Sequence, residues 1–181
     1  MKKNAIGALV GGIILFMWQF LSFGPLGIHN SQMMYTPQQD QILESLESAG
    51  LTEGEYFLPR APMGATSEDQ QALFEQRGGK PWAQISYREK LNFSQGSNMF
   101  RGLIIDILSV FLLIWILSNV SVPSMLTSIK VSVAIGLIGY FTINYLDSIW
   151  FETSSIPNLV DAIVQWGLCG VWLGWWMNRA S

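Results

Sequence analysis

The sequence predicts an all-α membrane protein with four transmembrane helices and a small α+β extracytoplasmic cap between helices one and two. Only 13% of the 181 residues are charged, whereas soluble domains typically reach about 25%. The mean hydropathy is +0.30. Four apolar segments are also long enough to meet the roughly 20 residues that a helix needs to span a bilayer.

These segments are residues 5–23, 99–120, 127–150 and 157–177. All four are expected to be helical, because an open strand cannot satisfy its backbone hydrogen bonds in hydrocarbon. The expected organisation is therefore helix one within residues 1–23, a cap over residues 24–98, and a three-helix region over residues 99–181.

The first segment also has features of a signal peptide, because Lys2 and Lys3 form a basic N-terminal flank. Its apolar run is long for a signal peptide, and only the weak motif at residues 22–24 resembles a cleavage site. We therefore expect helix one to be an uncleaved anchor.

Basic residues close to the helix ends predict the orientation in the membrane. Lys2, Lys3, Lys130 and Arg179 would all lie on one side of a four-helix protein. We expect that side, and both termini, to be cytoplasmic, with residues 24–98 outside the cytoplasm. Arg101 is the one basic residue that disagrees.

The predicted cap has signals for two helices and two strands. Thr36 is expected to be the N-cap of a capping box with Gln39, and Gly50 to end this first helix. Its apolar residues are expected to be buried: Ile42, Leu43 and Leu46.

Ser67 and Gln70 predict a second capping box in the cap, with Gly78 ending that helix. Residues 82–88 alternate, which is typical of a strand. Residues 55–59 are expected to pair with it.

Polar residues interrupt the apolar segments at one common depth, in the predicted outer half of the membrane. A charged carboxylate at mid-membrane costs roughly 2.5–3.5 kcal/mol or more, so Asp106 and Asp161 should face protein or water. Asn158 and Gln165 share a helical face with Asp161. The candidate ligand or proton site comprises Asp106, Asp161, Asp147, Asn144, Gln165 and Arg101, at the same depth as Gln19.

Two interpretations of these residues stay open. They could form an outward-opening pocket for a proton, a cation or a polar ligand, or they could join helices through hydrogen bonds between neutral side chains. Asp106 and Arg101 are five positions apart, a poor spacing for a direct ion pair on one helix.

The remaining unusual residues favour structural roles. The only histidine, His29, is expected at the membrane interface; it could ligate a haem iron, but a two-histidine haem site cannot form within one chain. The only cysteine, Cys169, is expected to pack between helices. Trp172, Trp175 and Trp176 are expected to form an interfacial belt at the inner end.

No familiar catalytic motif is present, and we expect no cofactor, no metal and no enzymatic activity. H-E-x-x-H, G-x-S-x-G, P-loop and G-x-G-x-x-G sequences are all missing. A membrane hydrolase that uses paired aspartates, Asp106 and Asp161, remains an alternative. The net charge of −3 gives no indication of nucleic-acid binding.

Three stretches resemble a loose, uncharacterised family of small bacterial inner-membrane proteins: "GALVGGIILFMWQFLSF", "DQILESLESAGLTEGEYFLPR" and "WFETSSIPNLVDAIVQWGLCG". The resemblance implies one helix, an exported segment and three further helices, in the bacterial inner membrane. It implies no activity and no catalytic residues.

These observations favour a non-enzymatic accessory or structural subunit of a membrane complex. The alternative is a small transporter or ligand-binding membrane protein that uses the outer aspartates. The expected partners are the lipid bilayer and either other membrane proteins or further copies of the chain, with no nucleic acid.

Overall fold

A computed structural model of the protein describes residues 2–119 and 124–179. The chain divides into two compact units, one formed by Met1–Met34 with Ser94–Ser181 and the other by Tyr35–Phe93. Residues 24–34, predicted to begin the cap, thus belong to the first unit. Val120, the predicted end of the second membrane helix, lies outside the described residues, as do residues 180 and 181.

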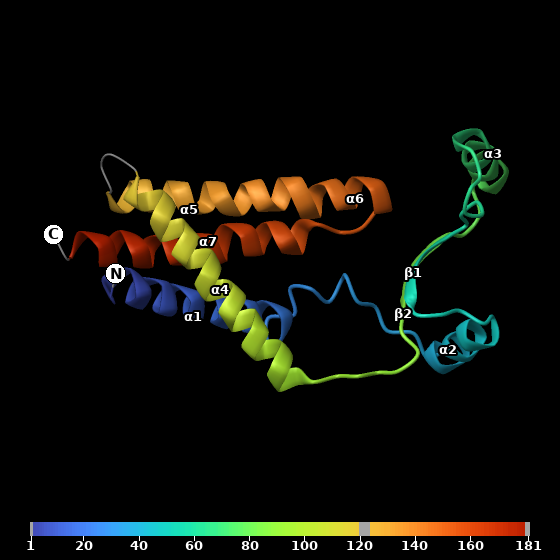
Figure 1. Ribbon diagram of the computed structural model, residues 1–181, viewed down its shortest axis with the longest axis horizontal. Coiled ribbons are helices and arrows are strands. Elements are labelled where there is room, and N and C mark those ends of the chain that lie inside the picture. Colours follow the sequence, from blue (N-terminus) through green and yellow to red (C-terminus); the bar gives the residue numbers. More distant parts are fainter. Residues whose placement is uncertain (1, 120–123, 180–181) are drawn as a thin grey trace. The chain divides into compact units, whose positions relative to one another are not determined.

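The first unit contains the long apolar helices (Figure 1). They are α1 (Lys2–Phe23), α4 (Gln95–Ser118), α5 (Met125–Gly139) and α7 (Ile156–Asn178). A π-helical turn, η1 (Tyr140–Tyr145), continues α5 into α6 (Leu146–Phe151). With α5 to α6 taken as one span, the described residues contain four helices long and apolar enough to cross a membrane. This confirms the four predicted segments to within a few residues at each end.

The helices of this unit pack as a layer of α5, α7 and α1, which α4 crosses obliquely (Figure 1). The main contacts join α5 to α7, α1 to α4, and α1 to α7, whereas α4 and α5 barely touch. The core lies where α1, α4 and α7 meet. Its buried side chains are Ala8, Leu15, Val110, Leu113, Ile114, Leu117, Cys169 and Leu173. Cys169 therefore packs in the core, as predicted.

Small residues allow the helices to approach closely. A β-carbon at Gly11 would lie 2.6 Å from Val110, and one at Gly170 would lie 2.8 Å from the Cα of Ile129. A β-carbon at Gly136 would lie 2.4 Å from the Trp166 ring. Glycine at these positions thus sets the spacing of α1 to α4 and of α5 to α7.

The tryptophans near the end of α7 connect it to the start of α1. The indole Nε1 of Trp172 donates to the carbonyl of Gly7 at 3.0 Å, and that of Trp176 donates to the carbonyl of Lys3 at 3.1 Å. The Lys3 ammonium donates to the carbonyl of Met177 at 3.2 Å. These bonds hold the N-terminal end of α1 beside the C-terminal end of α7.

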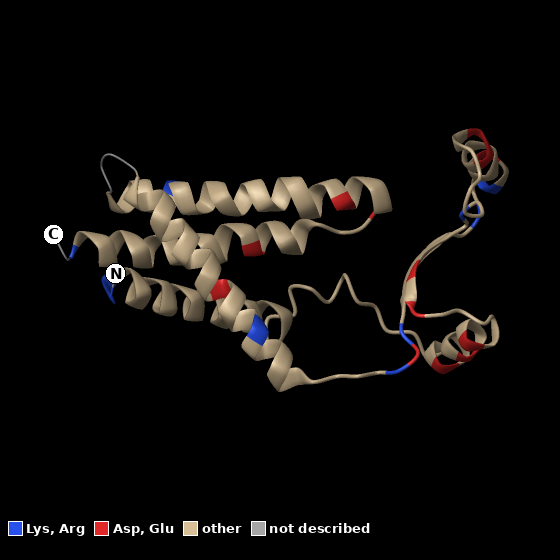
Figure 2. Ribbon diagram, viewed as in Figure 1, with Lys and Arg blue, Asp and Glu red and all other residues tan. Residues whose placement is uncertain are grey.

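The second unit, Tyr35–Phe93, is small and mixed. It comprises α2 (Gln39–Ser48), β1 (Gly54–Leu58), α3 (Ser67–Arg77) and β2 (Ala83–Tyr87). The strands pair antiparallel, with Tyr56 opposite Ile85, which confirms the predicted pairing. Figure 2 shows charged residues to be frequent in this unit and sparse on the long helices.

Two helix starts in the second unit differ from the predictions. The helix α2 begins at Gln39, because the Thr36 hydroxyl bonds the side chain and backbone N–H of Gln38 and caps no helical turn. The capping box of α3 uses Thr66 with Asp69, one residue before the predicted pair. At α3 two adjacent residues, Thr66 and Ser67, can both cap, whereas the N-cap of α2, Gln38, makes no side-chain capping bond.

The predicted burial of the α2 apolar face was also largely wrong. Ile42 is 48% exposed and Leu43 is 57% exposed. Leu46 is half-buried. A unit of this size contains little core to cover them.

Candidate functional site

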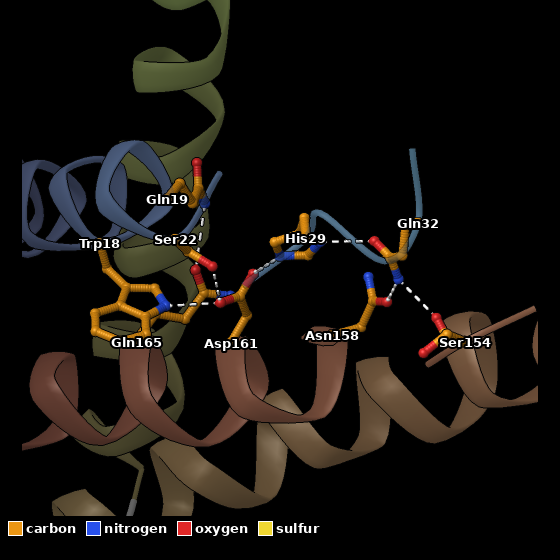
Figure 3. Close-up of polar contacts among 9 residues, drawn as sticks. All are labelled: Trp18, Gln19, Ser22, His29, Gln32, Ser154, Asn158, Asp161 and Gln165. Carbon is orange, nitrogen blue, oxygen red and sulfur yellow. Dashed lines mark hydrogen bonds and ion pairs between the residues drawn. The ribbon is translucent and has the colours of Figure 1, made fainter. Parts of the chain in front are cut away.

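Asp161 of α7 is the centre of a buried polar network (Figure 3). Its Oδ1 accepts hydrogen bonds from Trp18 Nε1 at 2.9 Å and from Ser22 Oγ at 2.6 Å, and its Oδ2 lies 2.8 Å from His29 Nε2. The residue is only 8% exposed. Asp161 therefore faces protein, as the sequence predicted.

Helix geometry brings these partners together. Trp18 and Ser22 are four residues apart on α1, so their side chains lie on one face of that helix. This face is directed toward α7, which α1 contacts along its length. Pro157 lies in the first turn of α7. Its missing N–H costs no hydrogen bond there, because the N–H groups of a first turn have no partner within the helix. Asp161 follows one turn later.

His29 is in the segment that follows α1, and it is only 4% exposed. The chain turns back at Gly27, whose φ of +58° suits glycine. The Phe23 ring stacks on the imidazole with centroids 3.7 Å apart. The sequence analysis placed His29 at the membrane interface but did not predict that it would be buried and bonded to Asp161.

Gln32 holds the other side of the imidazole. Its Nε2 donates to the Ser154 carbonyl at 2.7 Å and to Asn158 Oδ1 at 2.6 Å, and its Oε1 lies 2.6 Å from His29 Nδ1 (Figure 3). A backbone carbonyl can only accept. The atom facing Ser154 must therefore be the amide nitrogen, which places the amide oxygen against His29.

Asp106 of α4 belongs to a second cluster of polar side chains, in which Gln19 of α1 is the central residue. The Gln19 Nε2 donates to Asp106 Oδ1 at 3.0 Å and also reaches Gln165 Oε1 at 3.4 Å. Asp106 Oδ2 is buried without a hydrogen-bond partner among the described residues. Asp106 and Asp161 therefore have separate partners.

A cavity of about 570 Å³ lies beside this network. Much of its lining is apolar, including Leu112, Leu113 and Ile116 of α4 and Ile135 of α5. The amide-bearing residues that line it are Gln19, Asn144, Asn158 and Gln165, together with Asp161 and Tyr140. The cavity thus combines a largely apolar lining with several amide groups within the helical bundle.

Two predicted site residues lie elsewhere. Asp147 of α6 is exposed and borders a neighbouring hollow that also includes Gln32, Glu152 and Asn158. Arg101 is exposed on α4 and lines a separate hollow formed by α4 residues alone. Of the six predicted residues, Asp161, Asn144 and Gln165 line the cavity, and Asp106 connects to it through Gln19.

Within residues 2–119 and 124–179, no group of three or more His, Cys, Asp or Glu side chains is arranged to hold a metal ion. The fold and the network are those expected of a multi-pass membrane protein with a polar site enclosed by its helices. No protein-family model, curated protein or solved structure matches the chain.

Proposed function

We propose that this membrane protein binds an amphipathic ligand with an uncharged polar head in the cavity between α4, α5 and α7. The observation that carries the proposal is the cavity itself, whose largely apolar lining includes four amide side chains. Binding sites for small molecules commonly combine apolar walls with a few convergent polar groups.

The charge of the site favours an uncharged head. Asp161 is the only carboxylate among the cavity-lining residues, and both of its oxygens are engaged by Trp18, Ser22 and His29. The groups left for a ligand are neutral amides, such as the Nδ2 of Asn158 and the Nε2 of Gln165. Hydroxyl or amide groups on the ligand would satisfy them.

The position of the cavity favours a ligand with an apolar tail. Residues of both α4 and α5 line it, and these two helices barely contact each other. The apolar tail of a ligand could therefore lie between α4 and α5, within their membrane-spanning part. The network of α1 and α7 would hold the head.

Native mass spectrometry of the full chain in mild detergent tests this proposal. The protein would be offered an equimolar mixture of a monoacylglycerol, a fatty acid and an alkylamine of equal chain length. We expect the monoacylglycerol adduct to dominate. Ser109→Phe fills the cavity from α4 and should abolish the adduct, whereas Leu108→Phe, on the exposed side of α4, should retain it. Equal adducts in both variants would overturn the proposal.

The outer part of α4 favours a second candidate function, an accessory subunit of a membrane complex. Here Arg101 stands exposed between the exposed apolar residues Phe100, Ile104 and Ile105. A β-carbon at Gly102 would meet nothing within 4 Å. A partner helix bearing a polar group could pack on this face. Purification in mild detergent distinguishes the candidates, because a subunit should co-purify with a membrane partner and lose it on Arg101→Glu.

Both candidates are non-enzymatic. A hydrolase that uses paired aspartates needs two carboxylates that act on one water or substrate. Asp161 is instead fully engaged by its three neighbours, and Asp106 bonds to Gln19. The arrangement supports binding better than hydrolysis.

A further inference from the structure

We propose that His29 and Asp161 form a binding site for one proton, held between the imidazole Nε2 and the carboxylate Oδ2. This site goes beyond the proposed ligand cavity and does not depend on it. The hydrogen bonds around the two side chains define this site (Figure 3).

The other imidazole nitrogen, Nδ1, faces a hydrogen-bond acceptor. The Ser154 carbonyl fixes the orientation of the Gln32 amide, so His29 Nδ1 faces the Gln32 oxygen at 2.6 Å. An amide oxygen can only accept a hydrogen bond. Nδ1 must therefore carry a hydrogen, whatever the state of Nε2.

The two carboxyl oxygens of Asp161 have different partners. Its Oδ1 accepts from the Trp18 indole and from the Ser22 hydroxyl, so this oxygen is unsuited to carry a proton. Any proton on the carboxyl group belongs on Oδ2, which faces His29 Nε2 at 2.8 Å. A hydrogen bond across this distance needs one hydrogen, on either the nitrogen or the oxygen.

The two possible states contain the same number of protons. One is an imidazolium beside a carboxylate, and the other is a neutral imidazole beside a carboxylic acid. In both, the pair is neutral overall. Without the proton, a nitrogen lone pair would face a carboxylate, and a net negative charge would remain within the bundle, which is costly at membrane depth.

Few other charged groups act on this pair. On α4, Asp106 accepts a hydrogen bond from Gln19, which also donates to Gln165. On the outer side, Asp147 and Glu152 border the hollow that includes Gln32. From η1, the Tyr140 hydroxyl bonds to Ser155. No Lys or Arg among the described residues contacts Asp161, so His29 is the group that balances its charge.

The site has a consequence for the cavity, because Asp161 forms part of its wall. With the proton bound, that wall is neutral. Loss of the proton would make it negative and would set a nitrogen lone pair against the carboxylate, although Gln32 would still join the segment after α1 to Ser154 and Asn158. The proton therefore controls the charge of the cavity wall.

Nitrogen NMR of the full chain, labelled with ¹⁵N-histidine, tests the proposal directly because His29 is the only histidine. In weakly acidic and weakly basic buffer alike, Nδ1 should give the signal of a protonated nitrogen. Nε2 should show a coupling or shift characteristic of a shared hydrogen. An unprotonated Nδ1, or free titration like that of an exposed histidine, would overturn the proposal.

Two variants test the two sides of the imidazole separately. Asp161→Asn can still accept from Trp18 and Ser22 while donating to Nε2, so His29 should become a neutral imidazole with its hydrogen on Nδ1. Gln32→Met removes the amide oxygen that faces Nδ1, so the hydrogen of a neutral imidazole should no longer be confined to Nδ1. Gln41→Met, on exposed α2, should leave the histidine signals unchanged. A persistent imidazolium in Asp161→Asn would contradict the proposal. None of these signals requires the cavity ligand, so failure of the Ser109→Phe experiment would leave this result standing.

Discussion

Asp161 and His29 meet at 2.8 Å, although 132 positions separate them in the chain. One belongs to the last membrane helix and the other to the segment that leaves the first. Their contact joins that segment to the bundle, where Asp161 is only 8% exposed. It also gives Asp161 a partner whose charge can balance its own.

The first prediction is that Asp161 supports the fold through its hydrogen bonds. Asp161→Ala leaves the donors of Trp18 and Ser22, together with His29, without their acceptor. Each buried donor without a partner costs about 1–3 kcal/mol, so unfolding in detergent should occur at markedly lower temperature. Asp161→Asn should unfold close to the original protein.

Asp147→Ala is the matched control, because Asp147 is an exposed aspartate of the same unit. It should leave the unfolding temperature nearly unchanged. If Asp161→Ala were as stable as this control, the network around Asp161 would contribute nothing to the fold.

The second prediction concerns the close contact of α5 with α7. A β-carbon at Gly136 would lie 2.5 Å from the carbonyl oxygen of Ala162. Gly136→Ala must therefore push the helices apart, at a cost of about 1–3 kcal/mol. Gly102→Ala adds the same methyl group on α4, where nothing lies within 4 Å. Equal unfolding temperatures for the two variants would contradict the packing of α5 on α7.

The membrane helices were predictable from the sequence because length and hydropathy are properties of single segments. The position of Asp161 along its helix was predictable for the same reason, since it follows from counting turns. Its burial followed from the cost of exposing a carboxylate to lipid.

The partner of Asp161 was not predictable in this way. His29 follows a turn with proline and glycine just outside a helix, a position typical of an interfacial residue. Its inward direction depends on the backbone at Gly27 and on Gln32, which bonds to residues more than a hundred positions away. The sequence offered one signal: His29 and Asp161 are expected at similar depths, near the outer ends of neighbouring helices.

Arg101 shows the opposite error. It was included in the candidate site because its depth is close to that of Asp106, yet it is exposed on α4. Depth alone does not state which way a helical side chain points. The spacing of five positions from Asp106 already indicated a different face of the helix.

The third prediction is a loss of helix capping in acid at the start of α3. Asp69 accepts hydrogen bonds from the backbone N–H and the hydroxyl of Thr66, and these bonds lower the pKa of Asp69 below its ordinary value of 3.8. A lowered pKa in the folded state stabilises the fold at pH values above 3.8. This contribution is lost as the pH falls from there through the lowered value.

Hydrogen exchange at the Asp69 amide, which donates to the Thr66 hydroxyl, would measure this effect in the full chain. We expect protection to fall in acid, and Asp69→Asn to show weaker protection already at neutral pH. Glu68→Gln removes a charge from the same turn without removing the capping box. Comparable exchange in the two variants would show that charge alone, and not the capping bonds, protects this turn.

The fourth prediction is that both termini are cytoplasmic and that residues 35–93 lie on the opposite side of the membrane. Lys3 and Met177 are joined by a hydrogen bond, so the start of α1 and the end of α7 lie at the same end of the bundle. Lys2, Lys130 and Arg179 are expected to retain this end in the cytoplasm.

Cysteine placed at Ser67 should therefore react with a membrane-impermeant thiol reagent in intact spheroplasts, whereas cysteine at Asn178 should react only after permeabilisation. The native Cys169 is buried and supplies the unlabelled background. The reverse pattern, with Asn178→Cys labelled in intact spheroplasts and Ser67→Cys protected, would invert the topology and place the His29 end of α1 on the cytoplasmic side.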